Sequence, residues 1–461
     1  MAADLPHILI LMTDQQRADA MGCAGNPVIR TPNMDRLAAE GARLSRACTN
    51  SPLCMPARAS FISGHHVHRH GIWGNHGELP ADYESLFRRL QACGYYTAHV
   101  GKSHYYEHGE FHMREREPYM HARGFDYVHE TTGPWATLRT QSYMTDAWAR
   151  KGLLERFRDD YRRRKKDRAR AVWPGPLPTE EHMDSYVGRQ AVRFLREYDT
   201  ELPFCLFVGF PGPHEPWDPP EEYADMYDPA DVPPPVDPEP AEYPEWAPRH
   251  ARNHPNKRRA EGLDPETVRR IRAAYYAKVS LIDYWFGEIL AVCDEEGFAE
   301  DLLVVFWSDH GELAGDHGCL YKSRFWEGAL RVPLVFRWPG RIEPGTTSAA
   351  LAETVDIMPT LLEAVGTTAP DDAAGKSLWP VLEDPTAPLR NGALSEVEKN
   401  GSRNAMICTE RYKYAADGRE RGYMLYNLVE DPDEATNLIG HPEYEEVEKA
   451  LAARLRLRRG E

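Results

Sequence analysis

The 461-residue chain has no apolar run long enough to cross a membrane. Its apolar stretches, such as residues 7–12 and 302–307, are strand-sized, whereas a spanning helix needs about 18 apolar residues. No charged segment followed by an apolar one precedes Leu5, where the first strand is expected to begin. We therefore expect no membrane association and a cytoplasmic location.

Positive charge is in deficit. Lys and Arg total 55 against 72 Asp and Glu, which gives a formal net charge of −17. Because a field of that sign repels phosphate, we expect no nucleic-acid partner, and an anionic substrate would need a local cluster of positive charge. Hydrophobic residues at 42% and charged residues at 28% are ordinary globular usage, which excludes a disordered chain.

The eight cysteines show neither a CxxC pair nor the spacing of a zinc site. They also form no dense disulfide framework, so we expect most of them to be reduced thiols packed as small apolar residues. The sequence contains no internal repeat of useful period. Its length suggests two or three domains, or one large domain with an appendage.

Four apolar runs each end in polar residues. The runs cover residues 7–12, 97–100, 204–210 and 302–307. In the same order, the polar residues after them are Asp14 and Gln15, Lys102 and His104, His214, and Asp309 and His310. Ligands of open α/β sheets bind outside the carboxyl ends of the strands. We therefore expect these four clusters to converge on one crevice.

Helical periodicity fills the intervals between the apolar runs. It covers residues 34–40, 83–92, 183–198, 268–295 and 356–365. Strands that alternate with helices predict an α/β sandwich in which helices flank a large, mainly parallel sheet. Beyond about Gly366 the elements shorten, as at residues 403–409, 412–415 and 424–428. We predict a catalytic domain at residues 1–365 and a smaller C-terminal α+β domain at residues 366–461.

Two segments interrupt the alternation. Residues 150–170 are rich in Arg and Lys, and acidic residues dilute this charge, so we interpret them as the solvated face of a helical insertion. A basic arm is the alternative. Residues 218–248 are rich in Pro, Asp and Glu and predict an extended surface loop beside His214.

The most specific stretch is Cys54-Met55-Pro56-Ala57-Arg58. It resembles the C-x-P-x-R signature of the sulfatase family, in which the cysteine is oxidised to formylglycine. The resemblance extends from Leu9 to Leu438. It includes Gly101-Lys102-Ser103-His104, Pro213-His214, Ser308-Asp309-His310-Gly311-Glu312 and Tyr321-Lys322. It implies an alkaline-phosphatase-like fold and a formylglycine-generating enzyme as a maturation partner of this chain.

Local physics agrees with this resemblance. Pro56 suits the first turn of a helix that begins near Met55, because a proline lacks the N–H that would be unpaired there. The positive end of the helix would face an anion beside Cys54. Arg58, one turn inside the helix, would orient the oxygens of the hydrated aldehyde.

The resemblance also implies a metal site. Asp14, Gln15, Asp309 and His310 would bind one divalent cation together with residue 54. Gln15 and His310 depart from the pattern of many sulfatases and resemble the branch that contains choline sulfatases and phosphonate monoester hydrolases. The oxygen-rich set suits calcium, whereas the imidazole suits manganese better, so we expect one of these two ions.

Further family positions surround the ester. Lys102, His104, His214 and Lys322 match residues that stabilise the formylglycine oxygens, protonate the leaving oxygen and hold the sulfate. Asn75 either donates to the ester oxygens or is a turn residue.

Two more groups of residues could have a functional role, as a leaving-group pocket and as a metal site, although packing is the commoner role of such residues. They are an aromatic set for the leaving group (Trp73, Tyr105, Tyr106, Trp135 and Trp217) and a histidine run (His65, His66, His68 and His70).

The resemblance implies hydrolysis of a small-molecule sulfate monoester by a metal-activated covalent nucleophile. Asp309 would take the proton of the attacking hydroxyl and His214 would protonate the leaving alcohol, while His104 would assist release of the covalent sulfate. A phosphonate monoester or phosphodiester hydrolase that uses the same site is the alternative. A non-catalytic anion-binding protein is a second alternative, of another class. We expect a homo-oligomer.

Overall fold

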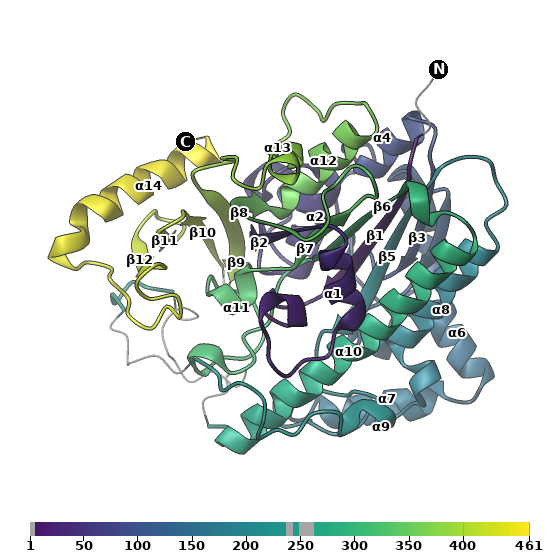
Figure 1. Ribbon diagram of the computed structural model, residues 1–461. Helices are drawn as coiled ribbons and strands as arrows, with labels where there is room; N and C mark the ends of the chain where they lie inside the picture. The colour runs from purple at the N-terminus through teal and green to yellow at the C-terminus, as the bar shows by residue number, and fades with distance from the viewer. Residues whose placement is uncertain (1–4, 237–242, 249–261, 400, 461) are drawn as a thin grey trace.

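The computed structural model describes residues 5–236, 243–248, 262–399 and 401–460. An eight-stranded sheet carries helices on both faces, and a four-stranded sheet lies to one side of it (Figure 1). The strands of the large sheet are β1 (His7–Asp14), β2 (Ala42–Cys48), β3 (Tyr96–Gly101), β4 (Tyr127–Glu130), β5 (Phe204–Pro213), β6 (Leu302–Ser308), β7 (Leu334–Arg337) and β8 (Thr346–Glu353).

The order of the large sheet is β4-β3-β5-β1-β6-β7-β2-β8. Strand β7 is antiparallel to its neighbours β6 and β2, and the other neighbouring pairs are parallel. This confirms the predicted α/β sandwich with a mainly parallel sheet. The four predicted apolar runs correspond to β3, β5, β1 and β6, which are consecutive neighbours.

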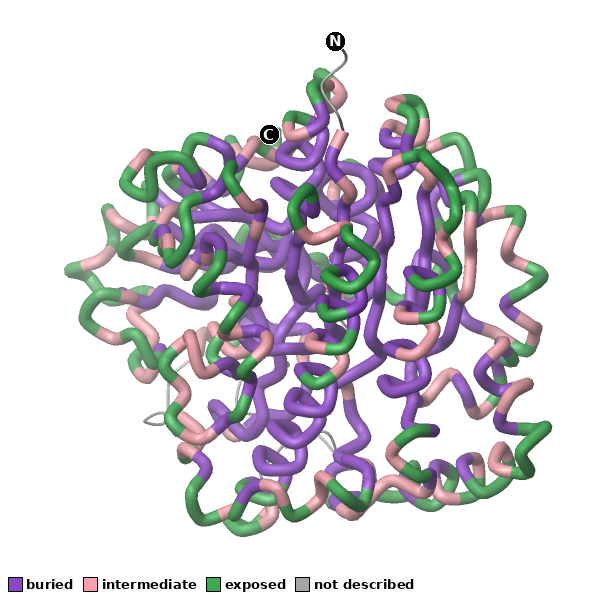
Figure 2. Tube along the Cα trace, turned by 45° about the vertical axis from the view of Figure 1, so that its right-hand side comes forward, coloured by how far each residue is buried: buried purple, intermediate pink, exposed green. Residues whose placement is uncertain are grey.

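Strand β1 shows why the central runs are continuously apolar. Ile8 and Ile10 point into one hydrophobic core, and Leu9 and Leu11 point into another. A strand covered on both faces must be apolar at every position, which is typical of parallel sheets. The central strands of the sheet are therefore buried along almost their whole length, and the centre of the molecule is coloured as buried in Figure 2.

Different helices build the two cores. Helices α1, α8 and α10 cover one face, and α2, α4 and α12 cover the other (Figure 1). Among the described residues, the α-helices that precede the smaller sheet are α1 (Pro32–Ala39), α2 (Cys54–Ser63), α3 (Val67–His70), α4 (Leu86–Ala92), α5 (Glu117–Ala122), α6 (Tyr143–Arg150), α7 (Leu154–Arg164), α8 (Met183–Arg196), α9 (Glu221–Ala224), α10 (Pro265–Glu295), α11 (Glu327–Leu330), α12 (Ile357–Ala364) and α13 (Trp379–Glu383). The five predicted helical segments correspond to α1, α4, α8, α10 and α12. In the part of the chain that the structure describes, no helix is both long and apolar enough to span a bilayer.

The smaller sheet is antiparallel, with the order β12-β11-β10-β9. Its strands are β9 (Ala393–Lys399), β10 (Ser402–Cys408), β11 (Tyr412–Ala416) and β12 (Gly422–Asn427), and α14 (Glu445–Arg459) packs on them. This confirms a smaller C-terminal α+β unit. Helix α13 still packs on the core of the large sheet, where Trp379 Nε1 donates to the carbonyl of Thr360 at 3.0 Å. The boundary between residues 365 and 366 stays a prediction.

The two interrupting segments differ in structure. Residues 150–170 contain α7, which buries Phe157 and Tyr161 and exposes Arg162, as expected of a helical insertion with a solvated face. The predicted loop at residues 218–248 contains the short helix α9 and irregular chain. Residues 237–242 of that loop lie outside the described residues.

Candidate active site

The four polar clusters meet at one edge of the large sheet. Strands β3, β5, β1 and β6 run parallel and side by side, so their carboxyl ends lie together. Asp14 ends β1, and Asp309 and His310 follow β6. His214 follows β5, and Lys102 follows β3. The convergence expected from the sequence is therefore what the structure shows.

Helix α2 brings Cys54 to this edge. The helix begins at Cys54, one residue earlier than expected, and Pro56 lies in its first turn. All ten of its residues are buried, and it ends at Gly64, whose left-handed φ of 71° suits glycine. Asn75 Oδ1 accepts a hydrogen bond from the Met55 amide at 3.0 Å, so this side chain caps the helix.

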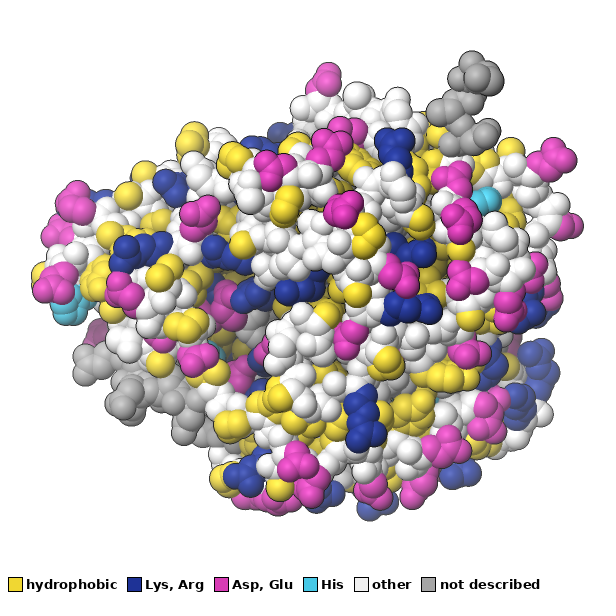
Figure 3. Space-filling model, in the orientation of Figure 1, with side chains coloured by type: hydrophobic (Ala, Val, Ile, Leu, Met, Phe, Trp, Pro, Cys, Tyr) yellow, Lys and Arg dark blue, Asp and Glu magenta, His cyan; other side chains and the backbone are white. Residues whose placement is uncertain are grey.

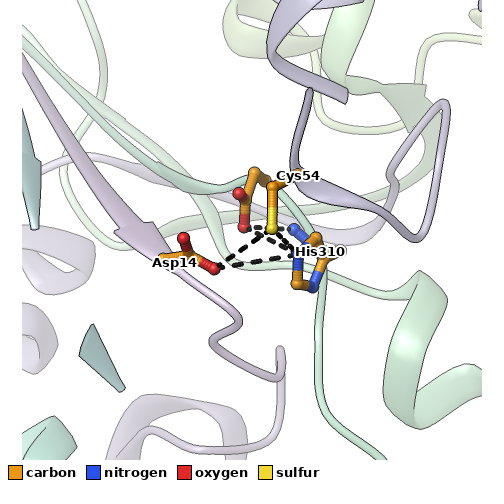
Figure 4. Close-up of side chains that lie close together, drawn as sticks. Asp14, Cys54 and His310 are labelled. Carbon is orange, nitrogen blue, oxygen red and sulfur yellow. Dashed lines mark hydrogen bonds and ion pairs between the residues drawn. The ribbon is translucent and has the colours of Figure 1, made fainter. Parts of the chain in front are cut away.

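Cys54 lies among three potential metal ligands. One ligand atom each of Asp14, Cys54, Asp309 and His310 lies within 4.8 Å of the others. Cys54 Sγ is 3.2 Å from His310 Nε2 and 3.7 Å from Asp14 Oδ1. The three labelled side chains in Figure 4 point toward one another from a strand end, a helix start and a loop.

The donor atoms suit a divalent cation. His310 Nδ1 lies 2.9 Å from the carbonyl of Gly311, which fixes the proton on Nδ1 and leaves the lone pair of Nε2 directed at the group. Burial lowers the pKa of His310 to about 4, so the ring is neutral. Two carboxylates and a neutral imidazole fit such an ion.

Gln15 lies beside these four residues. Its backbone N–H donates to Asp309 Oδ1 at 3.0 Å, and its side-chain oxygen accepts a hydrogen bond from Lys322. Its side-chain nitrogen donates to Glu215 and Glu312. Gln15 adopts a left-handed φ of 76°, which is unusual for a residue other than glycine. Its role as a metal ligand stays a prediction.

Arg58 holds the two carboxylates. It donates from Nε to Asp309 Oδ2 at 2.8 Å and from Nη2 to Asp14 Oδ2 at 3.0 Å, and the three side chains are fully buried. Its Nη1 donates to the carbonyls of Lys102 and Ser103. These contacts occupy each nitrogen of the guanidinium. Arg58 therefore positions the metal-ligand carboxylates, and its contact with the aldehyde oxygens stays a prediction.

Two lysines also contact the group. Lys102 forms an ion pair with Asp14, and Lys322 Nζ lies 3.2 Å from Cys54 Sγ. Burial raises the pKa of Asp14, but the charges of Lys102, His214, Lys322 and Arg58 outweigh it and hold that pKa well below the ordinary value. Asp14 is thus an anion, as a metal ligand must be.

The two predicted catalytic histidines have different surroundings. His214 Nδ1 lies 2.7 Å from the carbonyl of Glu215 and 3.1 Å from its carboxylate, so Nδ1 carries a proton and Nε2 is left for a ligand. The pKa of His104 lies well below the ordinary value, first because of burial and then because of His108 and Lys102. His104 is therefore neutral and able to accept a proton.

Three neighbours of the site were not predicted. Glu312 accepts from the amides of Ala314 and Tyr321 as well as from Gln15, and burial raises its pKa to about 7. Glu215 contacts both His214 and Gln15. His108 stacks on His104 with ring centroids 4.6 Å apart. Glu312 is the last residue of the motif Ser308-Asp309-His310-Gly311-Glu312, and this position was the only indication of its role in the sequence.

The histidine run is structural among the described residues. His66 Nε2 lies 2.8 Å from a Glu353 oxygen, and His68 Nδ1 lies at the same distance from a Glu396 oxygen. His70 contacts Ser60 on α2. Of the five aromatic residues proposed for the leaving group, Trp135 lines the cavity above the site, whereas Trp73, Tyr105, Tyr106 and Trp217 are buried in packing.

The chain matches a known protein family over most of its length. The family model "Sulfatase" matches residues 6–367, which is most of the chain. The chain belongs to the sulfatase family. A second model, "N-sulphoglucosamine sulphohydrolase, C-terminal", matches residues 315–461. The resemblance carried by the Cys54 motif is thus confirmed, and the enzyme class is that of the sulfuric ester hydrolases.

Individual sulfatase relatives agree. The chain is 30% identical to an arylsulfatase of Clostridium perfringens over 96% of its own length and 92% of that protein. It is 29% identical to a choline-sulfatase of Rhizobium meliloti over 96% and 84% of the two chains.

Solved structures share the fold. A phosphonate monoester hydrolase of Agrobacterium radiobacter superposes with a TM-score of 0.80 at 24% identity, covering 99% of this chain and 95% of that one. A protein solved with its substrate D-glucosamine-2-N,6-O-disulfate gives a TM-score of 0.75 at 23% identity, covering 99% and 98%. The fold is the alkaline-phosphatase-like sandwich that the resemblance implied.

Proposed function

We propose that this sulfatase hydrolyses a sulfate monoester with formylglycine at position 54 and one divalent cation. The observation that carries the proposal is the position of Cys54 at the start of α2, with Asp14, Asp309 and His310 around its side chain. The Cys54-to-Arg58 motif is the signature for the modification. Asp14, Asp309, His310, Gln15 and residue 54 would hold the cation.

Formylglycine, once formed, supplies a hydrated aldehyde with two hydroxyl groups, and the cation supplies positive charge to the reacting oxygens. The protein residues then move the protons. Asp309 Oδ1 is held by the amides of Gln15 and His310 at 3.0 and 2.9 Å, which fixes the carboxylate that accepts the proton of the attacking hydroxyl. As the attacking oxygen bonds to sulfur and the S–O ester bond breaks, His214 in its doubly protonated form, with Nδ1–H on Glu215, donates its Nε2 proton to the departing alcohol oxygen.

Release of sulfate needs a second base. His104 is half-buried and its ring is neutral, so its lone pair can take the proton of the second hydroxyl while the aldehyde forms again. Lys102 and Lys322 provide two positive charges beside Cys54 for the oxygens of the transferring group. An anionic ester needs local positive charge to bind to a protein whose net charge is −17, and the two lysines supply it.

The test is hydrolysis of 4-nitrophenyl sulfate by protein produced together with a formylglycine-generating enzyme. We expect release of 4-nitrophenol and sulfate that depends on a divalent metal and is restored by calcium or manganese after chelation. His310 favours manganese, because an imidazole is a better ligand for it than for calcium. Absence of turnover in fully converted, metal-loaded protein would contradict the proposal.

A phosphonate monoester or phosphodiester hydrolase is the second candidate. The TM-score of 0.80 to a phosphonate monoester hydrolase and the pairs Asp14-Gln15 and Asp309-His310 favour it. Lys102 and His104 favour the sulfatase, on the premise that their side chains would fill the space that a second substituent on phosphorus needs. We further propose a homo-oligomer in the cytoplasm. Sedimentation and cell fractionation test these two points.

A further inference from the structure

The space above the reacting centre is much larger than a sulfate group. The cavity has a volume of about 1540 Å³, and its lining includes Lys102, His104, His214 and Lys322 of the active site. Another part of the lining comes from residues 133–136, 138 and 139 and from residues 165–170, the turn that follows α7. The insertion that interrupts the α/β alternation therefore forms a wall of the substrate cavity.

Positive charge dominates this lining. Nine basic and four acidic side chains of the described residues line the cavity. The basic ones are Lys102, Arg139, Lys165, Lys166, Arg168, Arg170, Lys322, Arg324 and Lys399, and the acidic ones are Glu107, Asp167, Glu215 and Glu398. The whole chain has the opposite sign, with a net charge of −17, and both signs are interspersed on the face shown in Figure 3. A charged concave wall raises the local concentration of ligands of opposite charge.

Most of the acidic side chains in the lining are already paired. Asp167 lies 3.3 Å from Arg170, and Glu398 lies 3.3 Å from Arg403. Glu215 is held by His214 and Gln15 in the site itself. These acids therefore leave other cations of the wall without a protein counter-ion.

Arg168 and its neighbours Lys165 and Lys166 are such cations. None of the three forms an ion pair with a carboxylate in the part of the chain that the structure describes, and each lines the cavity. Lys165 and Lys166 are exposed, whereas Arg168 is half-buried. A half-buried guanidinium with no carboxylate at ion-pair distance is available to an anionic ligand in the cavity.

Trp135 holds Arg168 in place. The guanidinium carbon lies 4.0 Å from the centre of the indole ring. Tyr161 of α7, which is buried beneath the wall, packs against the same indole with centroids 5.5 Å apart. A guanidinium stacked on a ring keeps its N–H edge free for a planar or tetrahedral anion.

We propose that Arg168, stacked on Trp135 and flanked by Lys165 and Lys166, binds a second anionic group on the alcohol half of the sulfate ester. This inference rests on the proposed function and narrows its substrate class. In the proposed function, Lys102 and Lys322 bind the sulfate that is transferred. The cations at residues 165–168 are therefore additional to those that one sulfate group requires. The substrate class is an alcohol, of the size of a small saccharide, that carries a carboxylate or a further sulfate.

The test compares matched pairs of substrates. One pair is a 6-O-sulfated disaccharide with a uronate carboxylate and the same compound as its uncharged methyl ester. The second pair is a disulfated disaccharide and its 6-O-monosulfated counterpart. The quantity measured is the ratio of kcat/KM for the more anionic member to that for its partner, from release of inorganic sulfate. The pair with the larger ratio tells whether the second anion is a carboxylate or a sulfate.

Arg168→Gln and Arg162→Gln form the matched pair of variants. Arg162 belongs to the same insertion, is exposed, pairs with Asp159 at 2.7 Å and does not line the cavity. We expect a wild-type ratio of about tenfold or more for at least one pair, as an ion pair in a partly desolvated site provides. Arg168→Gln should reduce the ratio severalfold, and Arg162→Gln should leave it unchanged. Thermal unfolding of both variants shows that they fold.

Raised ionic strength should also lower the kcat/KM ratio of the wild-type enzyme, because salt screens partly exposed charges. Wild-type ratios near one for both pairs, or equal ratios in the two variants, would overturn the inference. These outcomes are distinct from failure of the proposed function. An enzyme that releases sulfate from the methyl ester but does not prefer the acid is a sulfatase without this subsite. An enzyme that releases no sulfate from any ester contradicts both.

Discussion

Arg58 Nε donates to Asp309 Oδ2 at 2.8 Å, with both side chains fully buried. The same guanidinium binds Asp14, so one cation from α2 joins the ends of β1 and β6. Two carboxylates in one buried group would repel each other without it. The contact places the helix that carries Cys54 against the strands that carry the metal ligands.

Replacement of Arg58 by alanine should therefore reduce both stability and activity. A buried pair that loses one partner leaves an uncompensated charge, and we expect a loss of about 3–5 kcal/mol in the free energy of unfolding. Urea unfolding measures it. Arg162→Ala is the control, because its ion pair with Asp159 is exposed and should contribute at most about 1 kcal/mol. Equal losses in the two variants would contradict this account of Arg58.

The metal site makes a second prediction. Asp309→Asn keeps the shape of the side chain and removes the charge that binds the ion, so the bound metal per chain should fall and turnover should be lost. Elemental analysis of dialysed protein measures the first effect. Asp159→Asn, at an exposed position, should keep the wild-type metal content. Unchanged metal content and activity in Asp309→Asn would place the metal elsewhere.

Glu130 predicts a pH dependence of stability. Burial raises its pKa to about 7, although Ser103 and Tyr106 donate hydrogen bonds to it. The folded protein holds this proton more tightly than the unfolded chain does, whose pKa is near 4.5. The contribution of Glu130 is thus fully present below about pH 4.5 and is lost as the pH rises through about 7.

Glu130→Gln, which cannot ionise, isolates this contribution. The free energy of unfolding of wild type minus that of the variant should fall by about 3 kcal/mol between pH 4.5 and 7.5, since one pKa unit corresponds to about 1.4 kcal/mol. Urea unfolding at several pH values measures the difference. A difference that stays constant, or that grows with pH, would show that Glu130 is ionised in the folded protein.

The preferred ester tests the role of Lys102 and His104. A diester or phosphonate ester needs room for a second substituent where a sulfate has only oxygen. Wild type should have a higher kcat/KM for 4-nitrophenyl sulfate than for the phenylphosphonate ester of the same leaving group. Shortening both side chains in Lys102→Ala/His104→Ala should narrow the gap. A wild-type preference for the phosphonate would assign the protein to the second candidate.

The sequence was sufficient for the parts of the site that local pattern determines. The apolar runs of β1 and β6 end in Asp14 and Asp309, and parallel neighbours bring their ends together whatever lies between them. The Cys54 motif is likewise continuous. The roles of Glu312 and Arg168 depend on packing between distant segments. No spacing in the sequence places Arg168 on Trp135, because that contact arises from the way the insertion folds back over the cavity.

Two local features also needed the structure. Asn75 was expected to contact the ester or to form a turn. The structure adds that its oxygen caps α2 at the Met55 amide, and the contact with the ester stays a prediction. For Arg58, the structure adds that its donors bind Asp14, Asp309 and backbone carbonyls, and its contact with the aldehyde oxygens stays a prediction. Side-chain direction within a buried helix is set by its neighbours, which the sequence does not reveal.

The central claim is that formylglycine at position 54 is the nucleophile. The most direct measurement is turnover of 4-nitrophenyl sulfate against the fraction of residue 54 that is converted, in preparations that range from unconverted to fully converted. Peptide mapping of residues 47–58 gives that fraction by mass. The account predicts turnover proportional to conversion, with none in unconverted protein or in Cys54→Ala. Equal turnover in unconverted and converted protein would contradict it.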